Sequence, residues 1–136
     1  MKYFNKLLGV WLLYMACLLT SCINSEDDLH GKWQLKYDET GTTHTQHADS
    51  LFYNFQKGSF SQLCLLKDGT YETFFGNYAL KDAEISIILL PESLEHWIYS
   101  DYVGWEEGVR TFKIVELSSD VLRLQYEGKE MGLRRY

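Results

Sequence analysis

The sequence predicts an all-β domain, folded as a closed antiparallel up-and-down barrel of about eight or nine strands. Three observations support this prediction: short segments of period-two hydrophobicity, turn residues roughly every eight to twelve positions, and no convincing helical period. An antiparallel sandwich is the alternative. We favour the barrel because short links between successive hairpins suit a meander, and because closing the sheet removes edges that invite aggregation.

The first expected strand begins at Trp33. Trp33, Leu35 and Tyr37 alternate with polar residues, so these three side chains are predicted to share one buried face. Residues 38–50 are polar, rich in Thr, His and Gly, and lack a period, which indicates a loop of about a dozen residues.

Gly, Asp, Ser and Pro mark the turns between the later segments. The clearest hairpin turn is Lys67-Asp68-Gly69-Thr70, since Asp-Gly tolerates the positive φ angles of tight turns. The only proline, Pro91, ends another segment, and residues 104–108 form a loop. The expected strands are residues 33–37, 51–55, 60–66, 71–78, 85–90, 95–102, 109–117, 121–126 and 131–136.

A leader precedes the domain. Two lysines in residues 1–6 are followed by residues 7–19, a 13-residue uncharged run that is shorter than the roughly 20 residues of a spanning helix. This order is typical of a secretory signal. Leu19-Thr20-Ser21-Cys22 then resembles, at every position, the lipobox of bacterial lipoproteins. The resemblance implies cleavage before Cys22 and acyl chains on Cys22. The alternatives are an ordinary signal peptide with an incidental cysteine, or a short membrane anchor.

Acyl chains on Cys22 would anchor the protein durably, because each buried methylene contributes about 0.8 kcal/mol. Ile23 follows in place of Asp, so the commonest inner-membrane retention signal of lipoproteins is missing. Ser25-Glu26-Asp27-Asp28 resembles the acidic export signal of Bacteroidota surface lipoproteins, and a solvated acidic linker explains it equally well. We therefore expect an outer-membrane lipoprotein, at the periplasmic face or cell surface, with a tether over residues 22–28 and a domain over residues 29–136.

Net charge argues against a nucleic-acid partner, and cysteine content argues against a disulfide within the domain. Without residues 1–21 the chain has 115 residues, with 11 Lys and Arg against 19 Asp and Glu, a formal charge of −8. Such an acidic domain argues against a nucleic-acid partner. Cys17 leaves with the leader and Cys22 is acylated, so Cys64 has no intramolecular disulfide partner. We expect a monomer without cofactor, stabilised by its aromatic side chains.

Several short motifs occur in order along the domain. They are Gly31-Lys32-Trp33, Asp68-Gly69-Thr70-Tyr71, Gly76-Asn77-Tyr78, Phe112-Lys113-Ile114 and Leu122-Arg123-Leu124. The first matches the Gly-x-Trp signature of lipocalins, and the series resembles small bacterial lipocalin-like lipoprotein domains. The second and third lipocalin signatures have no clear counterpart. The resemblance implies a barrel in which Gly31 and Trp33 close one end and Trp33 packs against an Arg of the last strand. The alternation of the last strand places Arg135 on the same face as its apolar residues, so it can reach Trp33. A guanidinium stacked on an indole is a favourable contact.

The aromatic stretch from residue 96 to residue 107 is the first candidate for ligand binding. Trp97, Tyr99, Tyr102 and Trp105 combine flat apolar faces with nearby carboxylates and hydroxyls. Sugars and amphipathic molecules bind to such surfaces. The alternative, which we favour, places Trp97 and Tyr99 in the core and Tyr102 and Trp105 over one end of the barrel.

Other residues that could bind a metal or take part in catalysis have simpler explanations. His44, His47 and Asp49 are ligand types that zinc accepts, but a solvated polar loop explains them better and no metal site is predicted. Cys64 lies among leucines, which favours a buried thiol over a nucleophile. Glu106-Glu107 is expected to point to opposite faces of a strand, so it lacks the converging carboxyls of a glycosidase.

Three functions remain after these exclusions. The first is a membrane-tethered barrel that binds a small hydrophobic, amphipathic or saccharide ligand. The second is a solid barrel whose loops bind a protein or a glycan. An enzyme is the weakest, because no catalytic constellation is visible. A cavity of a few hundred Å³ would support the first, and a packed interior with an exposed aromatic patch would support the second.

Overall fold

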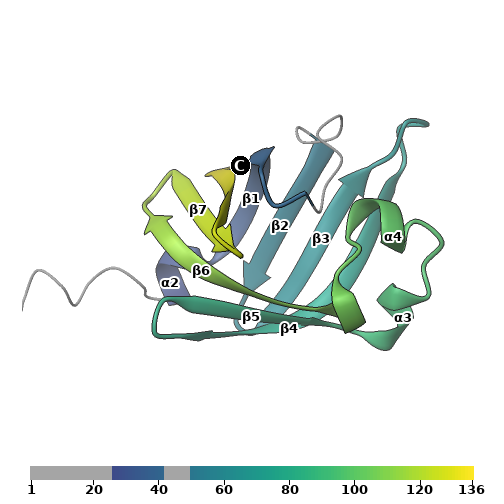
Figure 1. The fold of residues 1–136 in the computed structure, drawn as a ribbon. Coiled ribbons are helices and arrows are strands. Elements are labelled where there is room, and N and C mark those ends of the chain that lie inside the picture. Colours follow the sequence, from purple (N-terminus) through teal and green to yellow (C-terminus); the bar gives the residue numbers. More distant parts are fainter. Residues whose placement is uncertain (1–25, 42–49) are drawn as a thin grey trace, which may run out of the picture.

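Eight antiparallel strands follow one another in sequence order round a closed barrel, which confirms the predicted barrel and excludes the sandwich (Figure 1). The structure is a computed structural model that describes residues 26–41 and 50–136. The strands are β1 (Gly31–Asp38), β2 (Leu51–Gln56), β3 (Ser59–Leu65), β4 (Tyr71–Lys81), β5 (Glu84–Leu89), β6 (Val109–Leu117), β7 (Val121–Tyr126) and β8 (Lys129–Arg135). Pairing of β8 with β1 closes the sheet, so no strand presents a free edge along its whole length.

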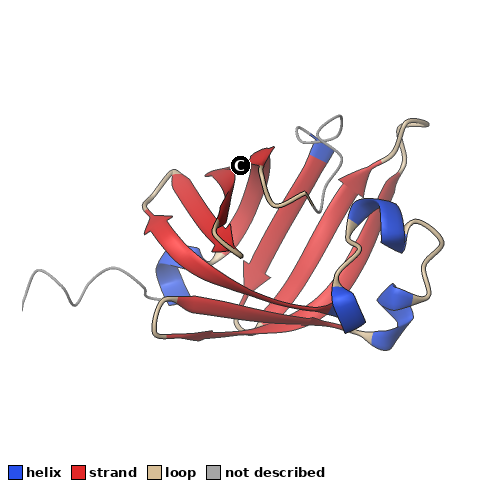
Figure 2. Ribbon diagram, in the orientation of Figure 1, coloured by secondary structure: helices blue, strands red, loops and turns tan. Residues whose placement is uncertain are grey.

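Short helices lie at the two ends of this barrel (Figure 2). They are α2 (Glu26–Leu29) at one end, and α3 (Pro91–Leu94), α4 (Tyr99–Tyr102) and the 3₁₀ turn η2 (Glu106–Gly108) at the other. None of the helices within the described residues is long and apolar enough to cross a membrane.

The prediction of a strand over residues 95–102 is wrong. Residues 90–108, which we call the cap, connect β5 to β6 through α3, α4 and η2. Pro91 begins α3, where its missing N–H would have had no helical partner. Trp97 is 78% exposed while its neighbour Ile98 is buried. The aromatic residues that imitated a strand pattern therefore lie on a segment that crosses one end of the barrel.

Two further expectations need correction. Residues 26–28, which we assigned to the tether, form α2, and Arg135 donates a hydrogen bond to the Asp28 carbonyl at 2.7 Å. The described domain thus begins before residue 29. Tyr37 was predicted to face inward, but the β1–β8 register shifts between Leu35 and Tyr37. The bulge turns the Tyr37 side chain outward, 40% exposed, and brings Asp38 to a buried position.

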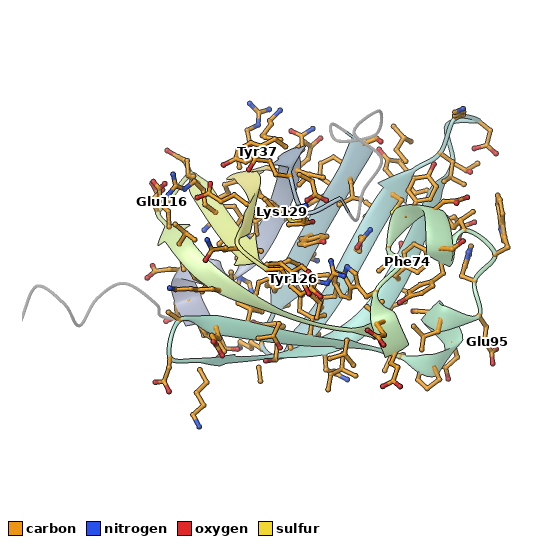
Figure 3. The ribbon with its side chains drawn as sticks, in the orientation of Figure 1. Tyr37, Phe74, Glu95, Glu116, Tyr126 and Lys129 are labelled. Carbon is orange, nitrogen blue, oxygen red and sulfur yellow. The ribbon has the colours of Figure 1, made fainter. Side chains whose placement is uncertain are left out.

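Aromatic rings fill much of the barrel interior. Tyr53 and Phe60 meet edge to face with centroids 5.2 Å apart, and Phe55 and Tyr78 do the same at 5.1 Å. Figure 3 shows Phe74 among these inward side chains. The largest fully buried side chains are Trp33, Tyr53, Phe55, Phe60, Phe74 and Phe112. Their burial stabilises the fold by removing large apolar surfaces from water.

One end of the barrel is closed by a dense polar network around Trp33. The indole Nε1 donates to the Leu29 carbonyl at 2.9 Å, and the Arg135 guanidinium lies 4.1 Å over the indole ring. Arg135 also donates to the carbonyls of His30 and Ser119, at 2.7 and 2.6 Å. Gly31 has a φ of +123°, which L side chains rarely adopt, and a Cβ there would also come within 2.9 Å of Arg135 Nη1. We call this the closed end.

Candidate binding site at the capped end of the barrel

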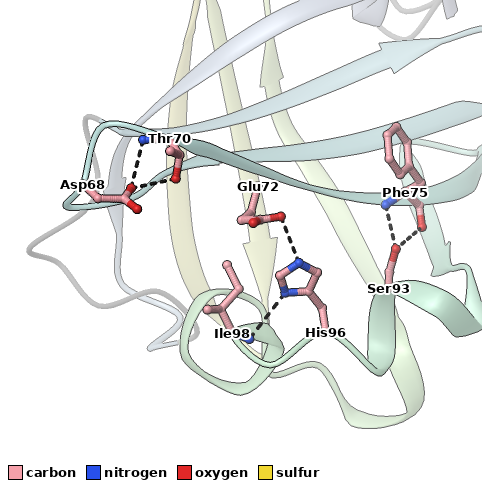
Figure 4. Close-up of polar contacts among 7 residues, drawn as sticks. All are labelled: Asp68, Thr70, Glu72, Phe75, Ser93, His96 and Ile98. Carbon is pink, nitrogen blue, oxygen red and sulfur yellow. Dashed lines mark hydrogen bonds and ion pairs between the residues drawn. The ribbon is translucent and has the colours of Figure 1, made fainter.

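Two side chains of the cap, those of Ser93 and His96, make polar contacts with β4 (Figure 4). The Ser93 hydroxyl accepts a hydrogen bond from the Phe75 backbone N–H at 2.9 Å and donates to the Phe75 carbonyl at 3.3 Å. His96 Nε2 lies 2.9 Å from a Glu72 carboxylate oxygen. The Ile98 N–H donates to His96 Nδ1 at 3.5 Å, which places the ring proton on Nε2 as the donor to Glu72.

Trp105 extends from the cap into the mouth of the barrel. Its ring is buried, with centroids 6.1 Å from Phe60 and 6.0 Å from Phe112. The Tyr99 hydroxyl donates to the Trp105 carbonyl and fixes the backbone on the cap side. Trp105 therefore forms a roof over the packed aromatic side chains of β2, β3 and β6.

Arg110 is the charged residue beneath this roof. It shares the inward phase of Phe112 and Ile114 on β6, and its side chain is only 7% exposed. The guanidinium carbon lies 3.9 Å from the centroid of the Tyr126 ring and 5.6 Å from that of Trp105. Figure 3 shows Tyr126 pointing into the barrel. Nε and Nη1 of Arg110 are buried, and neither has a hydrogen-bond acceptor among the described residues.

Gln62 brings a second polar group to the same end. Its side chain is 1% exposed, and Nε2 donates to the Tyr102 carbonyl of the cap at 2.9 Å. The amide oxygen Oε1 is buried and has no donor within the described part of the chain. Gln62 and Arg110 thus offer an acceptor and donors beneath neighbouring parts of the cap.

Burial favours the neutral forms of Tyr53 and Cys64 in the interior. Burial raises the pKa of Tyr53 far above its usual value; the nearby Asp38 carboxylate adds to the shift and Arg110 opposes it. Burial raises the pKa of the Cys64 thiol to about 12. Cys64 is a buried free thiol, as the sequence predicted, and at neutral pH it is not a thiolate nucleophile.

The four aromatic residues that the sequence singled out do not converge. Trp97 stacks against the His96 ring on the outside of the cap, and Trp105 lies inside the barrel. Tyr99 and Tyr102 are partly buried and pack against the core from the cap. Their role in ligand binding remains a prediction, and of the four only Trp105 extends into the interior.

Sequence reasoning missed Arg110 and Gln62. Each has a signal in the sequence: Arg110 has the same parity as Phe112 and Ile114, and Gln62 the same parity as Phe60 and Cys64. A polar residue in the apolar phase of a strand marks a buried polar group.

The remaining candidate residues do not add to this site. Glu106 and Glu107 are both exposed in the 3₁₀ turn η2, within the loop expected over residues 104–108. His44, His47, Asp49 and Cys22 lie outside the described residues. Within the described residues, no three His, Cys, Asp or Glu side chains gather to hold a metal ion.

Comparison with known proteins assigns the class of this fold. Residues 17–136 match the family model described as Lipocalin-like domain, and the chain belongs to this family. A lipocalin-like protein from Bacteroides uniformis ATCC 8492 is 57% identical with a TM-score of 0.74, over 80% of this chain and 99% of that one. An uncharacterised protein from Bacteroides eggerthii DSM 20697 is 43% identical with a TM-score of 0.69, over 79% and 98%. No curated protein matches the chain.

Proposed function

We propose that this chain is a lipid-anchored, non-enzymatic binding protein that holds a small amphipathic molecule beneath the cap of its barrel. The observation that carries the proposal is the position of the unpartnered buried polar atoms of Gln62 and Arg110. Burying such atoms costs free energy unless they find partners. A ligand with a polar group and an apolar body would satisfy them and contact the surrounding rings.

The geometry of the chain suits such an anchor. Cys22 precedes Glu26, the first residue of α2, by four residues, a span of at most about 14 Å. Since α2 packs at the closed end, acyl chains on Cys22 would hold that end next to the membrane. The capped end would then face away from the bilayer, where a ligand can reach it.

Native mass spectrometry tests the binding proposal. We would produce the full-length lipoprotein in a Gram-negative host, purify it in mild detergent and record its native spectrum. The expected result is a discrete mass above the acylated polypeptide that disappears on denaturation. The same chain after unfolding and refolding in buffer is the control, and should have lost this mass. A bare polypeptide mass, with no uptake of fatty acids, haem or oligosaccharides, would contradict the proposal.

A second function is favoured by a separate observation, the exposed apolar side chains on the cap and on two strands of the barrel. Phe75 on β4, Ile88 on β5 and Trp97 in the cap are each more than half exposed. Together with the dense aromatic interior, such exposed apolar side chains suit a module that binds a protein or a glycan. The bare mass described above would favour this second function.

A further inference from the structure

We propose that the ligand carries a single negative charge, on a carboxylate that pairs with Arg110. This inference rests on the proposed function, because it names the chemical class of the molecule beneath the cap. It begins from the burial of the Arg110 side chain, which is 7% exposed, with Nε and Nη1 lacking an acceptor within the described ranges.

No acid among the described residues forms an ion pair with Arg110. Within residues 26–41 and 50–136, Arg123 pairs with Glu116 and Glu130, and Glu72 contacts the His96 ring. Asp38 is a buried acid, and its negative charge helps to raise the pKa of Tyr53. Its carboxylate accepts hydrogen bonds from the backbone N–H and the hydroxyl of Thr40. A guanidinium stays charged in proteins, so Arg110 is a buried cation without an anionic partner of its own.

The contact with Tyr126 does not use the hydrogen-bond donors of the guanidinium. Its carbon lies over the Tyr126 ring, 3.9 Å from the centroid, while Nε and Nη1 have no acceptor among the described residues. The N–H groups lie in the plane of the guanidinium and point away from its faces. A carboxylate can accept two parallel hydrogen bonds from such an edge. Stacking on Tyr126 therefore orients Arg110 for an anion without consuming its donors.

Charge and surroundings favour a monoanion with an apolar body. One buried positive charge compensates one carboxylate, and a phosphate dianion would leave one negative charge unpaired in a chain of net charge −6. Trp105 and Phe112 supply apolar surface next to Arg110 and Tyr126. A fatty acid or an aromatic carboxylic acid matches this combination.

A role of Arg110 in ligand binding and a role in the fold predict different effects of its substitution on stability. If Arg110 serves a ligand, its uncompensated charge destabilises the free protein, and Arg110→Met should leave the urea midpoint unchanged or raise it. If Arg110 serves only the fold through its aromatic contacts, the same substitution should lower the midpoint. Arg123→Met is the matched control, since Arg123 pairs with Glu116 on the outside of the neighbouring strand.

Calorimetric titration of the full chain, stripped of any native ligand, tests the carboxylate. The probes are dodecanoate and dodecan-1-ol, which share the alkyl chain and differ in charge. We expect dodecanoate to bind the wild type at least about tenfold more tightly than the alcohol does, because charge-assisted pairs are the stronger hydrogen bonds. Arg110→Met should lose this preference and Arg123→Met should keep it. Arg110→Lys, which retains the charge without the fork, should keep part of it.

Two results would overturn the inference. Equal affinity of the wild type for both probes would rule out recognition of a carboxylate. The carrier function would still stand if the native spectra contain a ligand. Unchanged dodecanoate affinity in Arg110→Met would place the anion elsewhere. If neither probe binds and the native mass is bare, the proposed function fails as well.

Discussion

Arg135 shows how a single side chain can close one end of a barrel. Its face covers the Trp33 indole at 4.1 Å, and its N–H groups donate to three backbone carbonyls from α2, the start of β1 and the β6–β7 turn. These carbonyls lie at the ends of elements, where no ladder partner exists. A planar guanidinium with several in-plane donors suits this role better than a lysine.

Arg110 has the opposite character, although it is also an arginine stacked on an aromatic ring. Its donors Nε and Nη1 find no acceptor in the described chain, whereas those of Arg135 find three carbonyls. The same residue type therefore completes the structure at one end and leaves it incomplete at the other. This contrast is the physical reason for placing the ligand at the capped end.

Cys64 carries a prediction about alkaline stability. Burial raises the pKa of its thiol from 9.0 to about 12, so between these values unfolding releases a proton. The free energy of unfolding is then unaffected by this thiol below pH 9 and falls as the pH rises above it, by up to about 1.4 kcal/mol per unit. Urea unfolding of the wild type and of Cys64→Ala between pH 8 and 10.5 measures the slope, which should be shallower in the variant.

Cys64→Ser is the control for this prediction, since a serine hydroxyl does not titrate in that range. It should flatten the alkaline slope as alanine does, whatever its effect on stability at pH 8. Parallel pH curves for the wild type and both variants would contradict the assignment of this slope to Cys64.

Among the elements, the connection from β5 to β6 differs most from its neighbours. The other strands within residues 50–136 are joined by short turns, whereas this connection has its own helices and contributes Trp105 to the interior. Its polar contacts with β4 are few, chiefly those of Ser93 and His96. Such a segment can open without breaking the strand ladders of the barrel.

Ser93→Ala tests whether the cap opens as a unit. Loss of the hydroxyl leaves the part-buried Phe75 N–H without its acceptor, at a cost of about 1–3 kcal/mol. We expect hydrogen exchange of the amides in residues 91–105 to speed up by about tenfold or more, with the amides of β6 to β8 unchanged. In the ligand-bound protein, ligand release should speed up as well.

Ser100→Ala is the matched control for the cap, because Ser100 is exposed and lies in the same segment. It should leave the exchange of the cap as in the wild type. Uniform acceleration across the whole barrel in Ser93→Ala would mean that the cap unfolds only with the rest of the domain.

At the scale of the whole molecule, the barrel has two unlike ends. Residues next to the N-terminal segment pack at the closed end, and the candidate binding residues lie at the capped end. An anchor on Cys22 would therefore fix the direction in which the mouth faces. This direction can be measured.

Spin labels at the two ends test this orientation in lipid vesicles. We would label Ser119→Cys at the closed end, or Lys67→Cys in the β3–β4 hairpin at the capped end, in the full-length acylated chain. Nickel-chelating lipids should broaden the signal at residue 119 more than at residue 67. Cys64 is buried, so an unsubstituted chain is the control for background labelling. Equal broadening at both positions would contradict the proposed orientation.

The local patterns of the sequence were sufficient for the barrel, because alternation and turn residues act between near neighbours. Strands β2 to β8 lie close to the predicted ranges, except the predicted strand over residues 95–102. That segment alternates in the same way, yet it crosses the mouth of the barrel as a chain of short helices. Which surface a segment meets depends on distant residues, and alternation alone cannot show it.

The sequence by itself determined the number and order of most strands, the phase of Arg135 and the burial of Cys64. Only the tertiary structure decided which polar side chains lack partners. Arg110 occupies an inward phase that was visible in the sequence. Its lack of a hydrogen-bond acceptor depends on where the fold places Tyr126, Trp105 and the acidic residues. Hydrogen bonding is settled by geometry between residues far apart in the chain, so the candidate site emerges only when the barrel closes.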